Sequence, residues 1–250
     1  MKRQPRVALA QIKYFDKHDR HNIEKIKGFI AEAAKGKADI VCFPETCIIR
    51  EGYLNLNHKF VKEIAEECKK HKIWCIITDD VKHDSKIYNT AILIDRGGKR
   101  RGTYRKKRPY GEKHITPGSR VKVFNTDFGK IGIVICWDLA FSEFFQPMKK
   151  SGAQIIFCPA QWAYDEKSHD RHHRARELKL LKAIIQARAF ENLAYVAFCS
   201  PYLKEKDLIS YSAISSPHTV LKEVYNKEGL IFADLKLSDL TSFKKLYTGK

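Results

Sequence analysis

The sequence predicts an α/β fold in which two mixed β-sheets pack face to face, each covered on its outer side by helices, as a four-layer αββα sandwich. Short apolar runs typical of buried strands alternate with segments whose apolar residues recur at helical spacing. Tight turns join some neighbouring strands directly, which adds antiparallel pairs and makes the sheets mixed. The apolar strands are numerous enough to need two sheets. Because no repeat, low-complexity tract or Pro/Gly/Ser-rich linker divides the chain, we expect residues 1–250 to form one domain.

The first half of the chain alternates strands with amphipathic helices. Val7–Ile12 is expected to form a strand, and isoleucines at helical spacing predict a helix over Arg20–Lys35. A short buried strand follows at Ile40–Phe43. Further along, we expect a helix over Asn57–Lys70 and strands over Ile73–Thr78 and Thr90–Asp95, the last ending at the turn Gly97–Gly98.

The second half repeats this alternation. Strands over Val121–Asn125 and Lys130–Cys136 are joined by a tight turn at Asp127–Gly129. Helices are expected over Ser142–Lys150 and Arg174–Asn192, and strands over Ile155–Cys158, Tyr195–Cys199, Ser212–Ser215, Val220–Tyr225 and Leu230–Leu235.

Composition narrows the class of protein. At 250 residues and 44% hydrophobic, the chain can bury a full core, and no apolar run approaches the roughly 18–20 residues of a membrane span. Seven scattered cysteines without a Cys-x-x-Cys pair favour reduced thiols in the cytoplasm. The net charge of +18 would suit a nucleic-acid partner, but the lysines are spread along the chain, so solvated surface charge is the favoured interpretation.

Three reactive side chains, Glu45, Lys106 and Cys136, lie at or just after the ends of apolar runs. In an α/β protein the ends of strands are where catalytic groups are placed. A carboxylate base, an ammonium and a thiol are the groups needed for nucleophilic attack on a carbonyl or nitrile carbon. The combination predicts an enzyme.

Each of these residues also has a structural interpretation. Cys136, at the predicted junction of a strand and a helix, would have a lowered pKa, and the backbone N–H of Trp137 could donate to an oxyanion. The alternative is an inert buried thiol. Partial burial would raise the pKa of Glu45, although a loop carboxylate is the alternative. Lys106 lies in the basic run Arg105–Arg108, for which a solvated loop is the favoured interpretation when the run is taken alone.

Together the segments Phe43–Glu45, Tyr104–Lys106 and Ile135–Asp138 resemble, in this order, the three signatures of the nitrilase (carbon–nitrogen hydrolase) superfamily. Thr116–Gly118 and Ala187–Asn192 resemble flanking blocks of the same family. The resemblance implies an αββα sandwich without metal or organic cofactor that pairs through a helical face into a homodimer or a larger assembly.

The resemblance also assigns roles. It implies that Glu45 is the general base, Cys136 the nucleophile and Lys106 the cation that stabilises the oxyanion, with Glu112 as an auxiliary glutamate. The implied reaction passes through a thioester on Cys136 and releases ammonia or an amine from a small amide or N-carbamoyl substrate. Trp162 and Tyr53 are candidates for the substrate pocket.

Several alternatives remain open. The same three residues could hydrolyse a nitrile or transfer the acyl group to an amine, and a non-catalytic, nucleic-acid-associated protein could retain the fold. His169, Asp170, His172 and His173 lack an established metal-ligand spacing, so a solvated or rim segment is favoured over a metal site. With Arg105–Arg108, this segment is hypothesised to form a cationic entrance for an anionic substrate.

Overall fold

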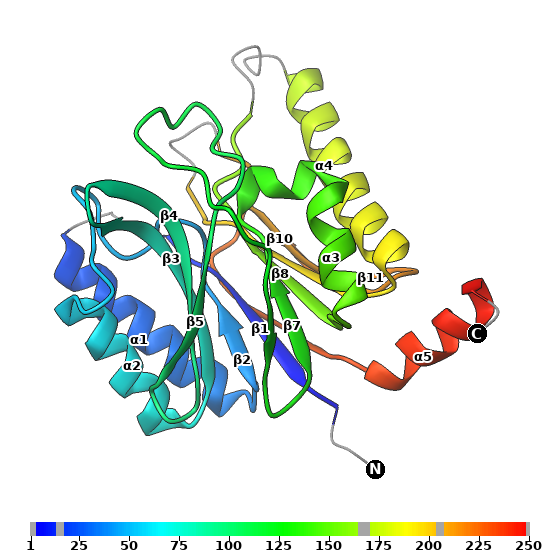
Figure 1. Ribbon diagram of the computed structural model, residues 1–250, viewed down its shortest axis with the longest axis horizontal. Coiled ribbons are helices and arrows are strands. Elements are labelled where there is room, and N and C mark those ends of the chain that lie inside the picture. The colour runs from blue at the N-terminus through cyan, green and yellow to red at the C-terminus, as the bar shows by residue number, and fades with distance from the viewer. Residues whose placement is uncertain (1–3, 14–17, 165–170, 204–207, 249–250) are drawn as a thin grey trace.

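The computed structural model describes residues 4–13, 18–164, 171–203 and 208–248. Within them, two six-stranded sheets lie face to face (Figure 1). Sheet A has the strand order β12-β1-β2-β3-β4-β5, and sheet B the order β11-β10-β9-β8-β7-β6. In each sheet three strands run parallel (β1-β2-β3 and β7-β8-β9) and the remaining pairs are antiparallel. The predicted mixed sandwich is confirmed.

The strands of sheet A are β1 (Arg6–Gln11), β2 (Ile40–Cys42), β3 (Trp74–His83), β4 (Lys86–Ile94), β5 (Arg100–Arg105) and β12 (Gly229–Asp234). Those of sheet B are β6 (Val123–Asn125), β7 (Lys130–Ile133), β8 (Ile155–Pro159), β9 (Tyr195–Cys199), β10 (Tyr211–Ser215) and β11 (Val220–Tyr225).

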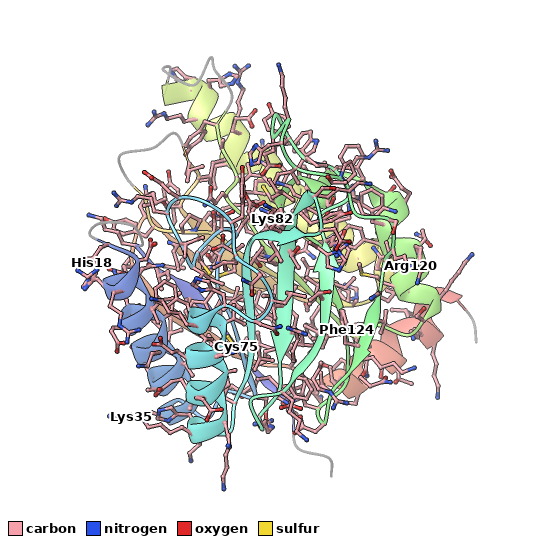
Figure 2. All side chains as sticks on the ribbon, turned by 60° about the vertical axis from the view of Figure 1, so that its left-hand side comes forward. His18, Lys35, Cys75, Lys82, Arg120 and Phe124 are labelled. Carbon is pink, nitrogen blue, oxygen red and sulfur yellow. The ribbon has the colours of Figure 1, made fainter. Side chains whose placement is uncertain are left out.

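Helices form the outer layers. Helices α1 (Asp19–Lys35) and α2 (Lys59–His71) cover sheet A, while α3 (Phe145–Lys150) and α4 (Arg171–Asn192) cover sheet B (Figure 1). His18 and Lys35 mark the two ends of α1 in Figure 2. Helix α5 (Leu237–Thr248) follows β12 at the side of the sandwich. No helix in the described part of the chain is both long and apolar enough to cross a membrane.

Strand β1 shows how the sequence separates two cores. Successive side chains of a strand point to opposite faces. Val7 and Leu9 therefore pack in the core between the sheets, whereas Ala8 and Ala10 pack against the helices that cover sheet A. The small alanine side chains leave room for the isoleucines of α1.

The structure differs from the sequence predictions at several places. In the predicted helix Ser142–Lys150, the first three residues form a 3₁₀ turn and α3 begins at Phe145. Strand β7 ends at Ile133 rather than at Cys136, because the N–H of Ile135 donates to the Asp138 side chain (3.1 Å) instead of extending the sheet. No strand was predicted over Arg100–Arg105, where the structure has the edge strand β5 with a buried Tyr104. Helix α5 was not predicted at all.

Candidate active site

The structure brings the three predicted reactive residues together at the ends of strands from both sheets. Glu45 follows β2 and Lys106 directly follows β5 in sheet A, while Cys136 follows β7 in sheet B. Their relative exposures are only 2%, 2% and 7%, respectively. Charged side chains are rarely buried so deeply unless they are paired.

Lys106 lies between two carboxylates. Its Nζ is 2.8 Å from Glu45 Oε1 and 2.8 Å from Glu112 Oε2. Burial alone would lower the pKa of Lys106, but the charges of Glu45, Cys136 and Glu112 outweigh that effect and raise the pKa well above its ordinary value. Lys106 is therefore a permanent cation, and it contacts Glu112, the glutamate to which the resemblance assigns an auxiliary role.

The second oxygen of Glu45 faces sheet B. Glu45 Oε2 accepts the backbone N–H of Gln161 (2.9 Å), and the side-chain amide of Gln161 donates to the Glu45 carbonyl (3.1 Å). Burial raises the pKa of Glu45, as predicted, with a further contribution from Glu112 and opposition from Lys106. A carboxylate in this state can accept a proton readily.

Cys136 opens a five-residue 3₁₀ turn, Cys136–Ala140, with a backbone φ of +46°. A non-glycine residue in this left-handed region costs about 1–3 kcal/mol, so surrounding contacts must hold it there. Its thiol is hydrogen-bonded to the Glu45 carboxylate. The three residues thus form one connected group, with Glu45 between the thiol and Lys106.

The predicted lowering of the Cys136 pKa is wrong. Burial, and then the adjacent Glu45 charge, raise the pKa of the thiol well above its ordinary value, despite opposing effects of Lys106 and the backbone N–H of Gln161. The short 3₁₀ turn supplies too few aligned N–H groups to compensate. At neutral pH the thiol is protonated next to a carboxylate that can take its proton.

An aromatic cluster begins at Trp137, the residue that follows Cys136. The Trp137 ring is 5.4 Å from that of Trp162 and 4.9 Å from that of Tyr110, which is 60% exposed. The predicted pocket residue Tyr53 is 46% exposed and lies 6.2 Å, between ring centroids, from His114. Two residues of loop 106–116 therefore contact different aromatic side chains: Tyr110 lies beside Trp137, and His114 lies near Tyr53.

The basic run Arg105–Arg108 separates into different surfaces. The Arg105 guanidinium lies over the Tyr88 ring (3.8 Å), and Lys107 Nζ donates to the carbonyl of Ser119 (3.3 Å). Arg108 lies over the ring of Phe141 (4.9 Å), and the Trp137 ring packs on the same Phe141 ring. Only Lys106 of this run contacts Glu45.

The predicted histidine segment falls partly outside the described residues, since His169 and Asp170 are not among them. Within the described ranges, no group of three or more His, Cys, Asp or Glu side chains could hold a metal ion. Two residues next to the reactive group were given no role from the sequence. Gln161 contacts Glu45, and Asp138 contacts the residues flanking Lys106 and Cys136.

Comparison with known proteins identifies the family of the chain. The family model for carbon–nitrogen hydrolases matches residues 6–245. The chain belongs to the carbon–nitrogen hydrolase family. It is 27% identical to the omega-amidase NIT2 of Homo sapiens, covering 96% of this chain and 91% of that protein. It is also 27% identical to the 2-oxoglutaramate amidase of Bacillus subtilis, covering 87% of this chain and 85% of that protein.

A solved structure of similar fold is Nit3 of Saccharomyces cerevisiae, a member of branch 10 of the nitrilase superfamily. It has a TM-score of 0.87 and 23% identity, over 98% of this chain and 94% of that chain. The predicted family, fold and enzyme class are therefore confirmed: the protein has the fold of this superfamily and is a carbon–nitrogen hydrolase.

Proposed function

We propose that this protein hydrolyses the amide of a small carboxylic acid through a thioester on Cys136, with Glu45 as general base and Lys106 as the oxyanion-stabilising cation. The observation that carries the proposal is the buried, connected group in which the Glu45 carboxylate contacts both the Cys136 thiol and Lys106 Nζ. The names of the relatives support an amide as the substrate.

In the first half-reaction the Cys136 thiol gives its proton to Glu45 while the sulfur attacks the amide carbon. The transfer moves one negative charge from the carboxylate to the sulfur, so the net charge beside Lys106 does not change. The charge then develops on the amide oxygen, where Lys106 and the backbone N–H of Trp137 can stabilise it. Glu45 returns the proton to the departing ammonia, and a thioester remains.

In the second half-reaction Glu45 takes a proton from water, and the hydroxide attacks the thioester carbon. The carbon–sulfur bond breaks, the acid is released and the proton returns to the sulfur. Glu112, which accepts hydrogen bonds from Lys106 Nζ and the Tyr110 N–H (3.0 Å), would keep Lys106 oriented through both halves. Lys106 itself need not gain or lose a proton.

We propose that the substrate carries a carboxylate, as the amides of dicarboxylic acids do. Arg108 beside Phe141 and the net charge of +18 support attraction of an anion to the aromatic surroundings of Cys136. Trp137, Trp162 and Tyr53 are the proposed contacts of the acyl chain.

The test is ammonia release from matched amides. Glutaramate and neutral butyramide would be compared at low and high salt, beside an N-carbamoyl amino acid and a nitrile. Wild type should release ammonia, the Cys136→Ala variant should not, and Cys68→Ala, which removes a remote buried thiol, should retain activity. Cleavage only of the nitrile or carbamoyl compound would overturn the amide proposal, and activity in Cys136→Ala would exclude Cys136 as nucleophile.

We propose further that the chain acts as one domain and as a homodimer in the cytoplasm. Seven free, buried cysteines support a reducing compartment. Exposed apolar residues on α4, among them Leu180 and Phe190, support pairing through that helical face. Sedimentation of wild type and a Leu180→Glu variant tests the pairing: a monomeric wild type would contradict it.

A further inference from the structure

A single buried carboxylate connects the loop of Lys106 to the turn of Cys136. Asp138 Oδ1 accepts the backbone N–H groups of Arg108 (2.8 Å) and Lys107 (3.1 Å). Asp138 Oδ2 accepts the hydroxyl of Tyr104 (2.7 Å) and the backbone N–H of Ile135 (3.1 Å). The side chain is fully buried.

These donors flank the reactive residues on both sheets. Tyr104 and Lys107 lie on either side of Lys106 at the end of β5, in sheet A. Ile135 immediately precedes Cys136, just after β7 of sheet B, and its carbonyl also accepts the Asp138 N–H (3.0 Å). Asp138 therefore closes a tight turn around the left-handed Cys136 and, with the same carboxylate, holds the chain on both sides of Lys106.

The carboxylate form is essential to this arrangement because all four groups donate. Burial raises the pKa of Asp138, while the hydrogen bonds from Tyr104, Ile135 and Arg108 and the charge of Lys106 oppose that shift. An asparagine of the same shape would place an NH₂ group against a backbone N–H on one side or the other.

We propose that Asp138 is a positioning residue that sets the distance between Lys106 and Cys136 across the two sheets. The inference rests on the proposed function, because Lys106 and Cys136 must act on the same carbonyl group. Asp138 does not contact the substrate in this proposal. It acts through the two residues that it holds.

The experiment compares Asp138→Asn with Asp39→Asn. Asp39 is a matched control: it is also buried, accepts the backbone N–H of Arg6 (2.8 Å) and pairs with Arg96, but it precedes β2 at the strand end opposite to Glu45. With the best amide, Asp138→Asn should lower kcat about 100-fold, as expected when transition-state contacts are misaligned, with KM changed less than threefold. Asp39→Asn should lose stability but keep kcat.

A second readout does not depend on amide hydrolysis. The rate of Cys136 alkylation by iodoacetamide is measured against pH, since only the thiolate reacts. If Asp138 holds Lys106 near the sulfur, Asp138→Asn should move the alkylation profile to higher pH by at least one unit, and Asp39→Asn should not. An unmoved profile, or alkylation that is faster at every pH because the fold has loosened, would overturn the proposal.

The two readouts separate the possible failures. If wild type cleaves no amide, the proposed function fails, while the alkylation profiles still decide the role of Asp138. If Asp138→Asn does not fold, Tyr104→Phe replaces it, because that change removes one donor and retains the carboxylate. Tyr104→Phe should then lower kcat about fivefold, and an unchanged kcat together with an unmoved alkylation profile would overturn the proposal.

Discussion

Replacing Lys106 by methionine would leave two carboxylates facing a space without a cation. In the wild type Lys106 Nζ contacts Glu45 and Glu112 at 2.8 Å each. Glu112 is partly exposed and can be hydrated, but the Glu45 side chain is almost fully buried. Removing one partner of a buried ion pair typically costs about 3–5 kcal/mol, because the other charge remains uncompensated.

Protonation of Glu45 limits this cost and makes it depend on pH. A glutamate has an ordinary pKa of about 4.3, so keeping it protonated costs about 3.7 kcal/mol at pH 7 and about 1.6 kcal/mol at pH 5.5. The folded variant binds this proton at a higher pH than the unfolded chain does. Its stability deficit relative to wild type therefore grows as pH rises, by up to about 2 kcal/mol between these values. For a protein of this size, that equals a change of about 4–8 °C in Tm.

The assay is calorimetry of wild type and Lys106→Met at pH 5.5 and 7.0 and constant ionic strength. The Tm deficit should be smaller at pH 5.5. Adding Glu45→Gln should remove the pH dependence, and Lys25→Met, which breaks a more exposed pair with Glu228, should cost less than about 1 kcal/mol at both pH values. A deficit that stays constant or grows on acidification would refute the assigned charges.

Four further predictions concern single residues. Iodoacetamide should alkylate only Cys136 in the folded protein, since the other six thiols are fully buried, and peptide mass spectrometry would reveal any second site. Burial raises the pKa of Asp79 to about 7, so the folded protein binds this proton at a higher pH than the unfolded chain does. The free energy of unfolding of the wild type should therefore fall as pH rises from about 4 to 7. Denaturant titration should find a smaller fall in Asp79→Asn. In Gly118→Ala the new methyl group would meet the Arg105 carbonyl, so this variant should lose about 1–3 kcal/mol of stability and also have a lower kcat/KM. In Gly28→Ala the methyl group on α1 would meet no other atom, so this variant should gain about 0.5–1 kcal/mol in the same titrations. Tyr110→Ala should change KM for the best amide while Tm stays within about 2 °C, and an unchanged KM would exclude Tyr110 from the substrate's surroundings.

The general position of the site could be predicted because it follows buried strands. Glu45 comes after an apolar run, and the resemblance of Tyr104–Lys106 to a family signature singled out Lys106 among several cations. Their contact at 2.8 Å could not be derived from the pattern, since 61 residues separate them. Sheet order, which places two strands, β3 and β4, between β2 and β5, decides that contact.

Strand β5 was missed because charge conceals its alternation. Gly102, Tyr104 and Lys106 occupy alternate positions, and Tyr104 and Lys106 turn inward and are buried. Arginines at the other positions can stay near water because β5 is the edge of sheet A. An alternation of this kind just before a candidate catalytic lysine is a signal that sequence reading could use.

The ionisation of Cys136 was predicted wrongly because the sequence does not give burial or the distance to Glu45. A helix after the thiol would lower its pKa, but the structure has a short turn and an adjacent carboxylate. Gln161 was missed for a related reason. Its contacts with Glu45 span 116 residues and involve the backbone of both partners, which carries no sequence signature.

The reactive residues come from both sheets, so the distances among them depend on how the two sheets are placed relative to each other. Glu45 and Lys106 follow strands of sheet A and contact each other, whereas Cys136 follows a strand of sheet B. No contact within one sheet therefore fixes the distance of either residue from Cys136. Gln161 and Asp138 reach across from sheet B and accept or donate at the two ends of the group. A substitution in the core between the sheets, such as Leu9→Ala, would let the sheets shift as the cavity relaxes. Activity should then fall by more than the loss of folded protein explains, since a displacement of about 1 Å can cost two orders of magnitude in rate.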